Sequence, residues 1–427
     1  MLSAFVNAFR VPDLRRKILF TLFIIVLYRI GCFIPVPGVP FHALADQFAN
    51  DTSGSMMLLN LFAGGALSYF SVFSLGIMPY ITASIIMQLM QGVIPSVAAW
   101  MRQGEIGRKK ITKWTRWLTV AISVVNALGY LLLFKSDAYG ITLNTTGLPG
   151  EWVTDIIIVV TMVVGSVLIM WLGELITQRG VGNGMSLIIF ANILSGFPQA
   201  ILSSLNLTAN GIAITAVIII VVLLLIPAIV FVERAQRRIP VNYSKRVTGR
   251  RVMGGSSTYI PLKVNPAGVI PIIFASAVVY FPAQISAVFG DVHWLRVVAD
   301  AVSNGWVNWI VTLLLIIFFT YFYSSMVFNA QNTADQLKQS GGFIPGIRPG
   351  KQTVQYIKGV TRRITLPGSI YLALIAVVPT ILFYFTGNTL ISAFGGTSIL
   401  IMVGVGLDTM SKVEAQLKMH NYEGFFK

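Results

Sequence analysis

The amino-acid sequence predicts an all-α polytopic membrane protein with ten transmembrane helices, and two observations support this fold class. First, 55% of the 427 residues are apolar and only 11% are charged, whereas a soluble domain carries about 25% charged residues. So few charges cannot coat a water-facing surface of this size, and lipid must therefore replace water over much of the exterior. Second, long apolar segments alternate with loops whose basic residues gather on one side.

Ten apolar segments approach the roughly 20 residues that a bilayer-spanning helix needs. Glycine and serine dilute the fifth and the tenth. The predicted spans lie at about residues 18–36, 72–94, 114–134, 152–172, 184–204, 211–232, 267–287, 306–328, 366–386 and 390–411.

The placement of charge tests this count. The net charge of +16 is compatible either with nucleic-acid binding or with the excess of Lys and Arg in cytoplasmic loops. With the N-terminus inside, 28 of the 31 Lys and Arg residues fall in the inner segments, and only Arg29, Lys135 and Arg296 do not. The positive-inside rule therefore favours ten spans with both termini in the cytoplasm, and it explains the net charge without nucleic acid.

Residues 52–101 form a stretch of fifty residues without a single charge. The stretch leads from an acidic outer loop to a basic inner one, so it must cross the membrane an odd number of times. One crossing uses about 20–25 residues and three would need more than about sixty. The surplus, which contains Gly64 and Gly65, is either an interfacial helix on the outer surface or a re-entrant segment in a central cavity, where non-helical backbone is tolerated.

Two inner loops, 233–266 and 330–365, are too long to be simple connections. Both mix basic residues with glycine and proline. We expect both to project into the cytosol as hairpins that meet a partner, although they could equally serve only to set topology.

The chain lacks the usual signatures of an enzyme or an ion-coupled transporter. GIRPGKQ, the nearest string to a phosphate-binding loop, has Pro345 at its first glycine position and Gln352 where Ser or Thr is required. No acid lies in the middle of a predicted span, where ion-coupled transporters place ionisable groups. Arg29 lies near the outer end of its span, from which its side chain is expected to snorkel to the surface. We therefore predict a passive conduit without enzymatic activity, cofactor or metal. A secondary transporter or a membrane-embedded enzyme would need site residues that do not appear.

Six ordered strings resemble the SecY family of protein-conducting channels, from about residue 10 to residue 425. They are FAGGALSYFSVFSLGIMPYITASIIMQL (62–89), GVGNGMSLIIFANI (180–193), VERAQRRIPVNYSKR (232–246), KVNPAGVIPIIFAS (263–276), GGFIPGIRPGKQT (341–353) and GGTSILIMVGVGLD (395–408). The resemblance implies two pseudo-symmetric halves of five spans each. These are residues 1–205, with a plug, and residues 206–427, with the hairpins 233–266 and 330–365.

The same resemblance implies a pore closed at its waist by a ring of aliphatic side chains. The matching residues are Ile77, Ile81, Ile189, Ile193, Ile273 and Ile401. Branched apolar side chains can close around a translocating chain without any fixed hydrogen-bond code. The plug that seals the outer side of the ring would be Asn60, Leu61, Phe62, Ala63, Gly64, Gly65, Ala66, Leu67, Ser68 and Tyr69.

A lateral gate is implied between the second and third spans and the seventh and eighth, with Thr82, Gln88 and Phe281 at gate positions. Docking of a SecA motor or a ribosome is implied at Lys245, Arg246, Arg250, Arg251 and Arg348, and arginine suits both phosphate and carboxylate partners. The resemblance further implies small SecE and SecG subunits, signal sequences and unfolded polypeptides as substrates, and a multi-pass location in a bacterial inner membrane.

Overall fold

The computed structural model describes residues 9–37, 39, 63–135, 151–205, 208–243, 246–248, 251–253, 257–288, 297, 305–327, 330–386 and 395–423. The helices in this part of the chain are α2 (Pro12–Gly31), α5 (Met78–Val93), α6 (Pro95–Arg102), α7 (Glu105–Lys135), α8 (Glu151–Arg179), α9 (Gly184–Leu205), α10 (Thr208–Arg234), α11 (Ile270–Val288), α13 (Gly305–Val327), α14 (Ala330–Gln339), α15 (Lys351–Thr386) and α17 (Gly396–Glu423). The strands are β1 (Gln236–Tyr243), β2 (Arg246–Thr248), β3 (Arg251–Met253), β4 (Ser257–Lys263) and β5 (Gly342–Phe343).

Each of the ten predicted spans lies on one helix: α2, α5, α7, α8, α9, α10, α11, α13, α15 or α17. By length and composition, within the described residues, α7, α8, α13 and α15 each contain a segment long and apolar enough to cross a bilayer. The fold is therefore the helical membrane bundle that the sequence predicts.

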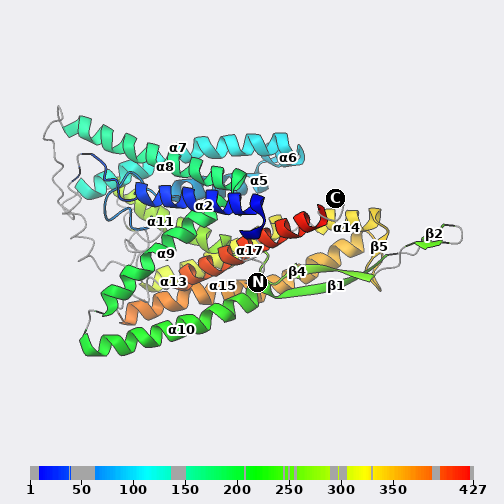
Figure 1. Cartoon of the computed structure of the whole chain (residues 1–427). Coiled ribbons are helices and arrows are strands. Elements are labelled where there is room, and N and C mark those ends of the chain that lie inside the picture. Colours follow the sequence, from blue (N-terminus) through cyan, green and yellow to red (C-terminus); the bar gives the residue numbers. More distant parts are fainter. Residues whose placement is uncertain are drawn as a thin grey trace.

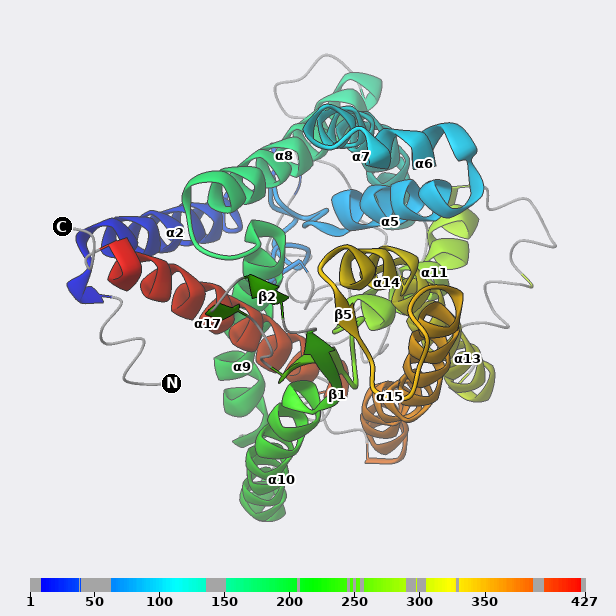
Figure 2. The ribbon, with the colours of Figure 1, turned by 90° about the vertical axis from the view of Figure 1, so that its right-hand side faces the viewer.

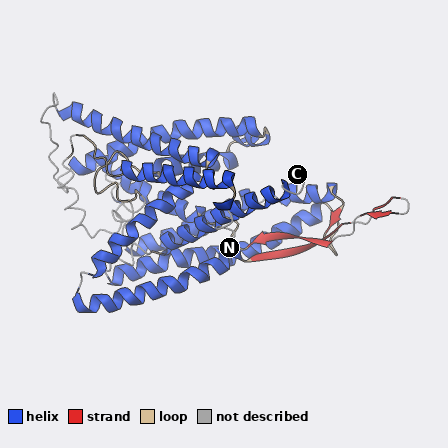
Figure 3. Cartoon of the chain, viewed as in Figure 1, coloured by secondary structure: helices blue, strands red, loops and turns tan. Residues whose placement is uncertain are grey.

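The long helices run alongside one another, and the strands extend from one end of the bundle (Figure 1). The first turn of α2 and the last turn of α17 lie at this same end, which Figure 3 marks by its red strands. This placement agrees with the prediction that the termini and the basic loops share one side. Seen from that end, the helices surround a centre, and the non-helical segment that precedes α5 lies inside them (Figure 2).

Two boundaries differ from the prediction. Helix α5 begins at Met78 rather than near residue 72, because Gly76 adopts a positive φ of 56° and Pro79 opens the helix; proline fits a first turn, where its missing N–H has no helical partner. Helix α15 begins at Lys351, so loop 330–365 is not a hairpin of irregular chain. It consists of α14, the short strand β5, a turn and the start of α15.

Loop 233–266 does form a hairpin, with β1 antiparallel to β4 and β2 antiparallel to β3. Strand β1 also pairs with β5, which gives the strand order β4–β1–β5. The two basic loops, which the sequence treats as separate, are therefore joined in one sheet.

Candidate functional site

The six aliphatic residues proposed for the pore ring come together in one hydrophobic cluster. Five of them are buried, and Ile273 in α11 is partly buried against the same cluster. They come from four helices or their first turns: α5, α9, α11 and α17. The cluster also takes in much of the bundle interior, so burial agrees with a ring without singling one out.

Residues 63–77, which directly precede α5, are largely buried although they are not helical. Residues 63–77 form a succession of turns, and Ala66 and Leu67 have no exposed surface. Among the predicted plug residues, Asn60, Leu61 and Phe62 lie outside the described residues. Non-helical backbone at membrane depth needs protein around it, and the segment meets this condition. The alternative of an exposed interfacial helix does not fit residues 63–77.

The end of this segment is fastened to the chain that follows α2. The Val36 N–H donates to the Phe70 carbonyl at 3.0 Å, and the Val72 N–H donates to the Ile34 carbonyl at 2.9 Å. The Phe73 ring stacks on the Tyr28 ring, with the centroids 5.5 Å apart. These contacts hold residues 70–73 against the end of α2 and the chain after it, and the segment stays buried from there to the start of α5.

The beginning of the segment is held by Arg29, in the last turn of α2. Its Nη1 donates to the Gly64 carbonyl at 2.8 Å, and its guanidinium lies 5.6 Å from the centroid of the Phe33 ring. The expectation that Arg29 snorkels to the surface is therefore wrong: its side chain is half-buried and reaches inward, because a buried carbonyl offers an acceptor there. Only a weak sign of this pairing is visible in the sequence: an arginine inside an apolar span and a glycine pair in an uncharged stretch.

The predicted lateral gate lies where α5 and α7 meet α11. A Cβ added to Gly92 in α5 would lie 3.5 Å from the Phe322 ring of α13, so α13 also reaches this seam. Thr82 donates to the Met78 carbonyl at 3.0 Å and Gln88 donates to Ser84 at 3.3 Å, so the hydrogen bonds of both predicted gate residues stay within α5. Phe281 lies in α11, but its side chain is outside the described part.

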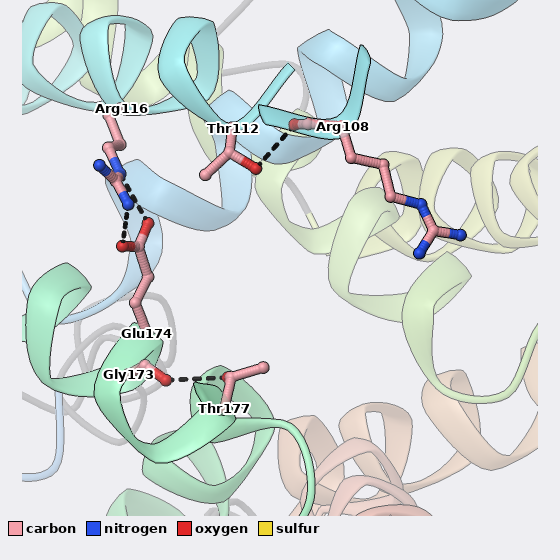
Figure 4. A network of polar contacts seen from close by, with 6 residues as sticks. All are labelled: Arg108, Thr112, Arg116, Gly173, Glu174 and Thr177. Atoms are coloured by element: carbon pink, nitrogen blue, oxygen red, sulfur yellow. Dashed lines mark hydrogen bonds and ion pairs between the residues drawn. The ribbon is translucent and has the colours of Figure 1, made fainter. Parts of the chain in front are cut away.

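Helices α7 and α8 are joined by polar contacts that the sequence did not predict. The Arg116 guanidinium forms a two-pronged ion pair with Glu174, with Nε 2.9 Å from Oε1 (Figure 4). Further along the same pair of helices, the buried Ser123 hydroxyl donates to Ser166 at 2.9 Å. A fork-shaped ion pair fixes orientation as well as distance, so α7 is expected to move together with α8.

The strands and the helices beside them have a small hydrophobic core of their own. Ile239 and Val241 of β1 and Leu262 of β4 pack with Leu337 of α14 and Ile357 of α15. The sheet and this core join residues 233–266 and 330–365 into one folded unit, which we call the platform.

The buried side-chain amide of Asn265 holds the base of the platform, where β4 leads into α11. Asn265 donates to the Glu233 carboxylate at 2.7 Å and to the Gly268 carbonyl at 3.0 Å, and only 2% of Asn265 is exposed. These bonds fix the angle at which the hairpin leaves α10 and returns to α11.

The predicted docking residues lie on or beyond this platform. Arg348 is exposed in the turn before α15, where its carbonyl accepts a bond from the Thr353 hydroxyl at 3.0 Å. Arg246 in β2 and Arg251 in β3 lie on the paired distal strands, whereas Lys245 and Arg250 are outside the described residues. Among the residues that the structure describes, no three His, Cys, Asp or Glu side chains gather as metal ligands would.

Comparison with known proteins decides the family. The SecY family model matches residues 71–410. The chain belongs to the SecY family. Its SecY relatives include a protein translocase subunit of Streptomyces coelicolor, 48% identical over the whole of both chains, and one of Mycobacterium bovis, 47% identical over the same share.

Solved structures share the SecY fold at low sequence identity. A protein-conducting channel has a TM-score of 0.63 and 18% identity, covering 95% of this chain and 92% of the other. A second structure with the same values concerns a SecY plug domain that stabilises the closed state of the translocation channel. Sec61 in a canine ribosome–channel complex has a TM-score of 0.58 and 16% identity, covering 95% and 92%. At this low sequence identity, these similarities establish the fold and nothing more.

Proposed function

We propose that this chain is the channel subunit of a protein translocase, which passes unfolded polypeptides across a membrane and releases apolar segments into it. The observation that carries the proposal is the match to a protein translocase subunit over the full length of both chains. Within the described part of the chain, no three His, Cys, Asp or Glu side chains gather, and this supports a passive conduit, because a polypeptide of any sequence must pass without being bound tightly.

Closure would depend on the ring and the plug in series. The burial of Ile77, Ile81, Ile189, Ile193 and Ile401 supports an aliphatic gasket. The turns at residues 63–69, with Ala63, Ala66 and Leu67 buried, support a plug, which would close the side of the ring facing away from the strands. Small residues such as Ala63 and Ala66 suit this role, since they pack closely but bury little apolar area and so are released at little cost.

Opening would part the two halves, residues 1–205 and 206–427, along the seam of α5 and α7 with α11 and α13. The internal hydrogen bonds of Thr82 and Gln88 support this gate, because neither has to break when the helices separate. Phe281 would contribute from α11. A signal sequence would enter here, and all ten long helices would cross the membrane with both termini in the cytoplasm.

Energy would come from outside the channel, from a SecA motor with ATP or from the ribosome. The joined platform supports a single docking face that includes Arg348, Arg246 and Arg251, with Lys245 and Arg250 at the hairpin tip. SecE- and SecG-like subunits would complete the complex in a bacterial inner membrane.

Reconstitution tests this function. The chain, co-purified with its small subunits, is placed in proteoliposomes with the motor, ATP and a secretory precursor. We expect the precursor to become protected from protease only when the chain, the motor and ATP are all present and the signal sequence of the precursor is intact. Equal protection in vesicles that lack the chain would contradict the proposal. A precursor without its signal is the matched control.

A further inference from the structure

Arg29 is a cation in largely apolar surroundings. It lies in the last turn of α2, and the Gly64 carbonyl and the Phe33 ring are its contacts. Among the described residues, no carboxylate forms an ion pair with it. A half-buried guanidinium without a counter-ion gains from every neutral acceptor that it can reach, and a carbonyl bonded to a charged donor is held more firmly than one bonded to a neutral donor.

Gly64 is shaped to receive this side chain. Its φ is +69°, and an added Cβ would overlap the Asn192 Oδ1 and lie 2.8 Å from the Arg29 Nη1. Asn192, in α9, has no exposed surface. Gly64 is thus enclosed between α2 and α9. Its neighbour Gly65 has a similar φ of +83°, but an added Cβ there would meet nothing within 4 Å.

We propose that Arg29 is a positioning residue that latches the plug: its hydrogen bond to Gly64 holds residues 63–69 inside the bundle when the channel is idle. The latch rests on the proposed function, because it assigns a role to the plug of that channel. Arg29 contacts the start of the segment, whereas the bonds to Ile34 and Val36 hold its end. Releasing the latch therefore lets the segment swing out while its end remains attached to the chain after α2.

The latch is reversible because of where Arg29 lies. It is near the end of α2 that is remote from the strands, so water that enters as the segment leaves can hydrate the guanidinium. One charge-assisted hydrogen bond then changes the ratio of seated to released plug by about tenfold or more. A lysine at this position would keep the charge but lose the planar fork that reaches the carbonyl while lying near a ring.

Thiol labelling from the outer side measures plug release without any translocation. The sole cysteine is removed by Cys32→Ser, and Ala66→Cys places a thiol at a fully buried position of the plug. The full chain in native membrane vesicles, with its subunits, reacts with a membrane-impermeant maleimide. Into this background go Arg29→Met, Arg29→Lys, Gly64→Ala and Gly65→Ala, with the exposed Arg16→Met of the same helix as the charge control.

We expect Arg29→Met to raise the labelling rate about tenfold, Arg29→Lys to raise it less, and Arg16→Met to match the background. The labelling rate of Gly64→Ala should be higher than that of Gly65→Ala. Both substitutions strain a positive φ, but only the methyl group added at Gly64 collides with Asn192 and Arg29. Unchanged labelling in Arg29→Met would overturn the latch. Equal labelling of the two glycine variants would overturn it as well. Labelling that follows this order in vesicles that fail to translocate would sink the proposed function and leave the latch standing.

Discussion

Ile193 gives the sharpest test of the aliphatic seal. It lies in α9 with no exposed surface, beside Asn192 and in one cluster with Ile77 and Ile401. Replacing such a residue by alanine costs about 2–5 kcal/mol when the site cannot collapse. If opening removes about half of these contacts, Ile193→Ala favours the open state by about 1–2.5 kcal/mol, which is about a 5- to 70-fold larger open population.

The assay is ion leak through idle channels. Proteoliposomes with the unmodified complex or the Ile193→Ala variant are loaded with a chloride-sensitive dye, and the rate of quenching is recorded without motor or precursor. The variant should leak several-fold faster. It should also let precursors with defective signal sequences through, because the closed state is less favoured.

Ile156→Ala is the matched control, since Ile156 lies in α8 with 54% of its surface exposed. The same methylene and two methyl groups are removed there without opening an interior cavity. Leak through Ile193→Ala no faster than through Ile156→Ala would refute the assignment of Ile193 to the seal, whatever the effect on stability.

Three further predictions concern the helix pairs and the platform. Arg116→Gln and Glu174→Gln should each lower the melting temperature, and the double variant should lower it by less than the sum of the two. The interaction energy between the two side chains stays within about 1 kcal/mol because the guanidinium is half-exposed. Strictly additive effects on the melting temperature would count against the ion pair. Asn265→Ala should speed hydrogen exchange of residues 257–268 about tenfold, since it breaks the bond to Glu233; unchanged exchange would show that the sheet alone fixes the base of the platform. Arg348→Glu should slow motor- or ribosome-driven transport at an unaltered melting temperature, and normal export rates would remove Arg348 from the docking face.

Helix positions could be predicted because lipid imposes a simple rule on composition and charge. The rule failed where a helix leaves the membrane. The charges of Arg362 and Arg363 in the first part of α15 favour a loop, yet its buried Val354 and Ile357 recur at helical spacing. Their spacing was a usable signal. The pairing of β1 with β5 was not predictable in this way, because nothing local links Tyr243 to Gly342 across about a hundred residues.

The sequence predicted the apolar parts of the candidate site, but it did not predict the polar contacts. The surplus of uncharged chain before α5 predicted chain that does not span the membrane, and it left open whether that chain lies on the surface or in the interior. Residues 63–69 are turns with Ala66 and Leu67 fully buried, whereas residues 72–77, predicted as the start of a span, are not helical. Arg29 was misplaced because snorkelling is the usual outcome for a cation near a span end, and only tertiary structure brings the Gly64 carbonyl within reach. A carbonyl acceptor leaves no trace in the sequence, so a contact of this kind is found only from coordinates.

The polar contacts divide the molecule in a way that suits the proposed gate. Arg116–Glu174, Ser123–Ser166 and Arg29–Gly64 each join elements of residues 1–205, while Asn265–Glu233 and Ser324–Thr365 join elements of residues 206–427.

Between the halves, the contacts described are of another kind. Leu14 and Ile18 of α2 pack with Val413 of α17, and Gly92 faces Phe322 across the seam. Directional bonds hold an element rigidly, because a partner left unbonded in an apolar interior is costly, whereas apolar contacts are non-directional and change gradually with area. We propose that a bundle built this way moves as two stiff halves. The free energy of parting them would be set by the apolar area exposed, and an inserting apolar signal sequence would cover that same kind of surface.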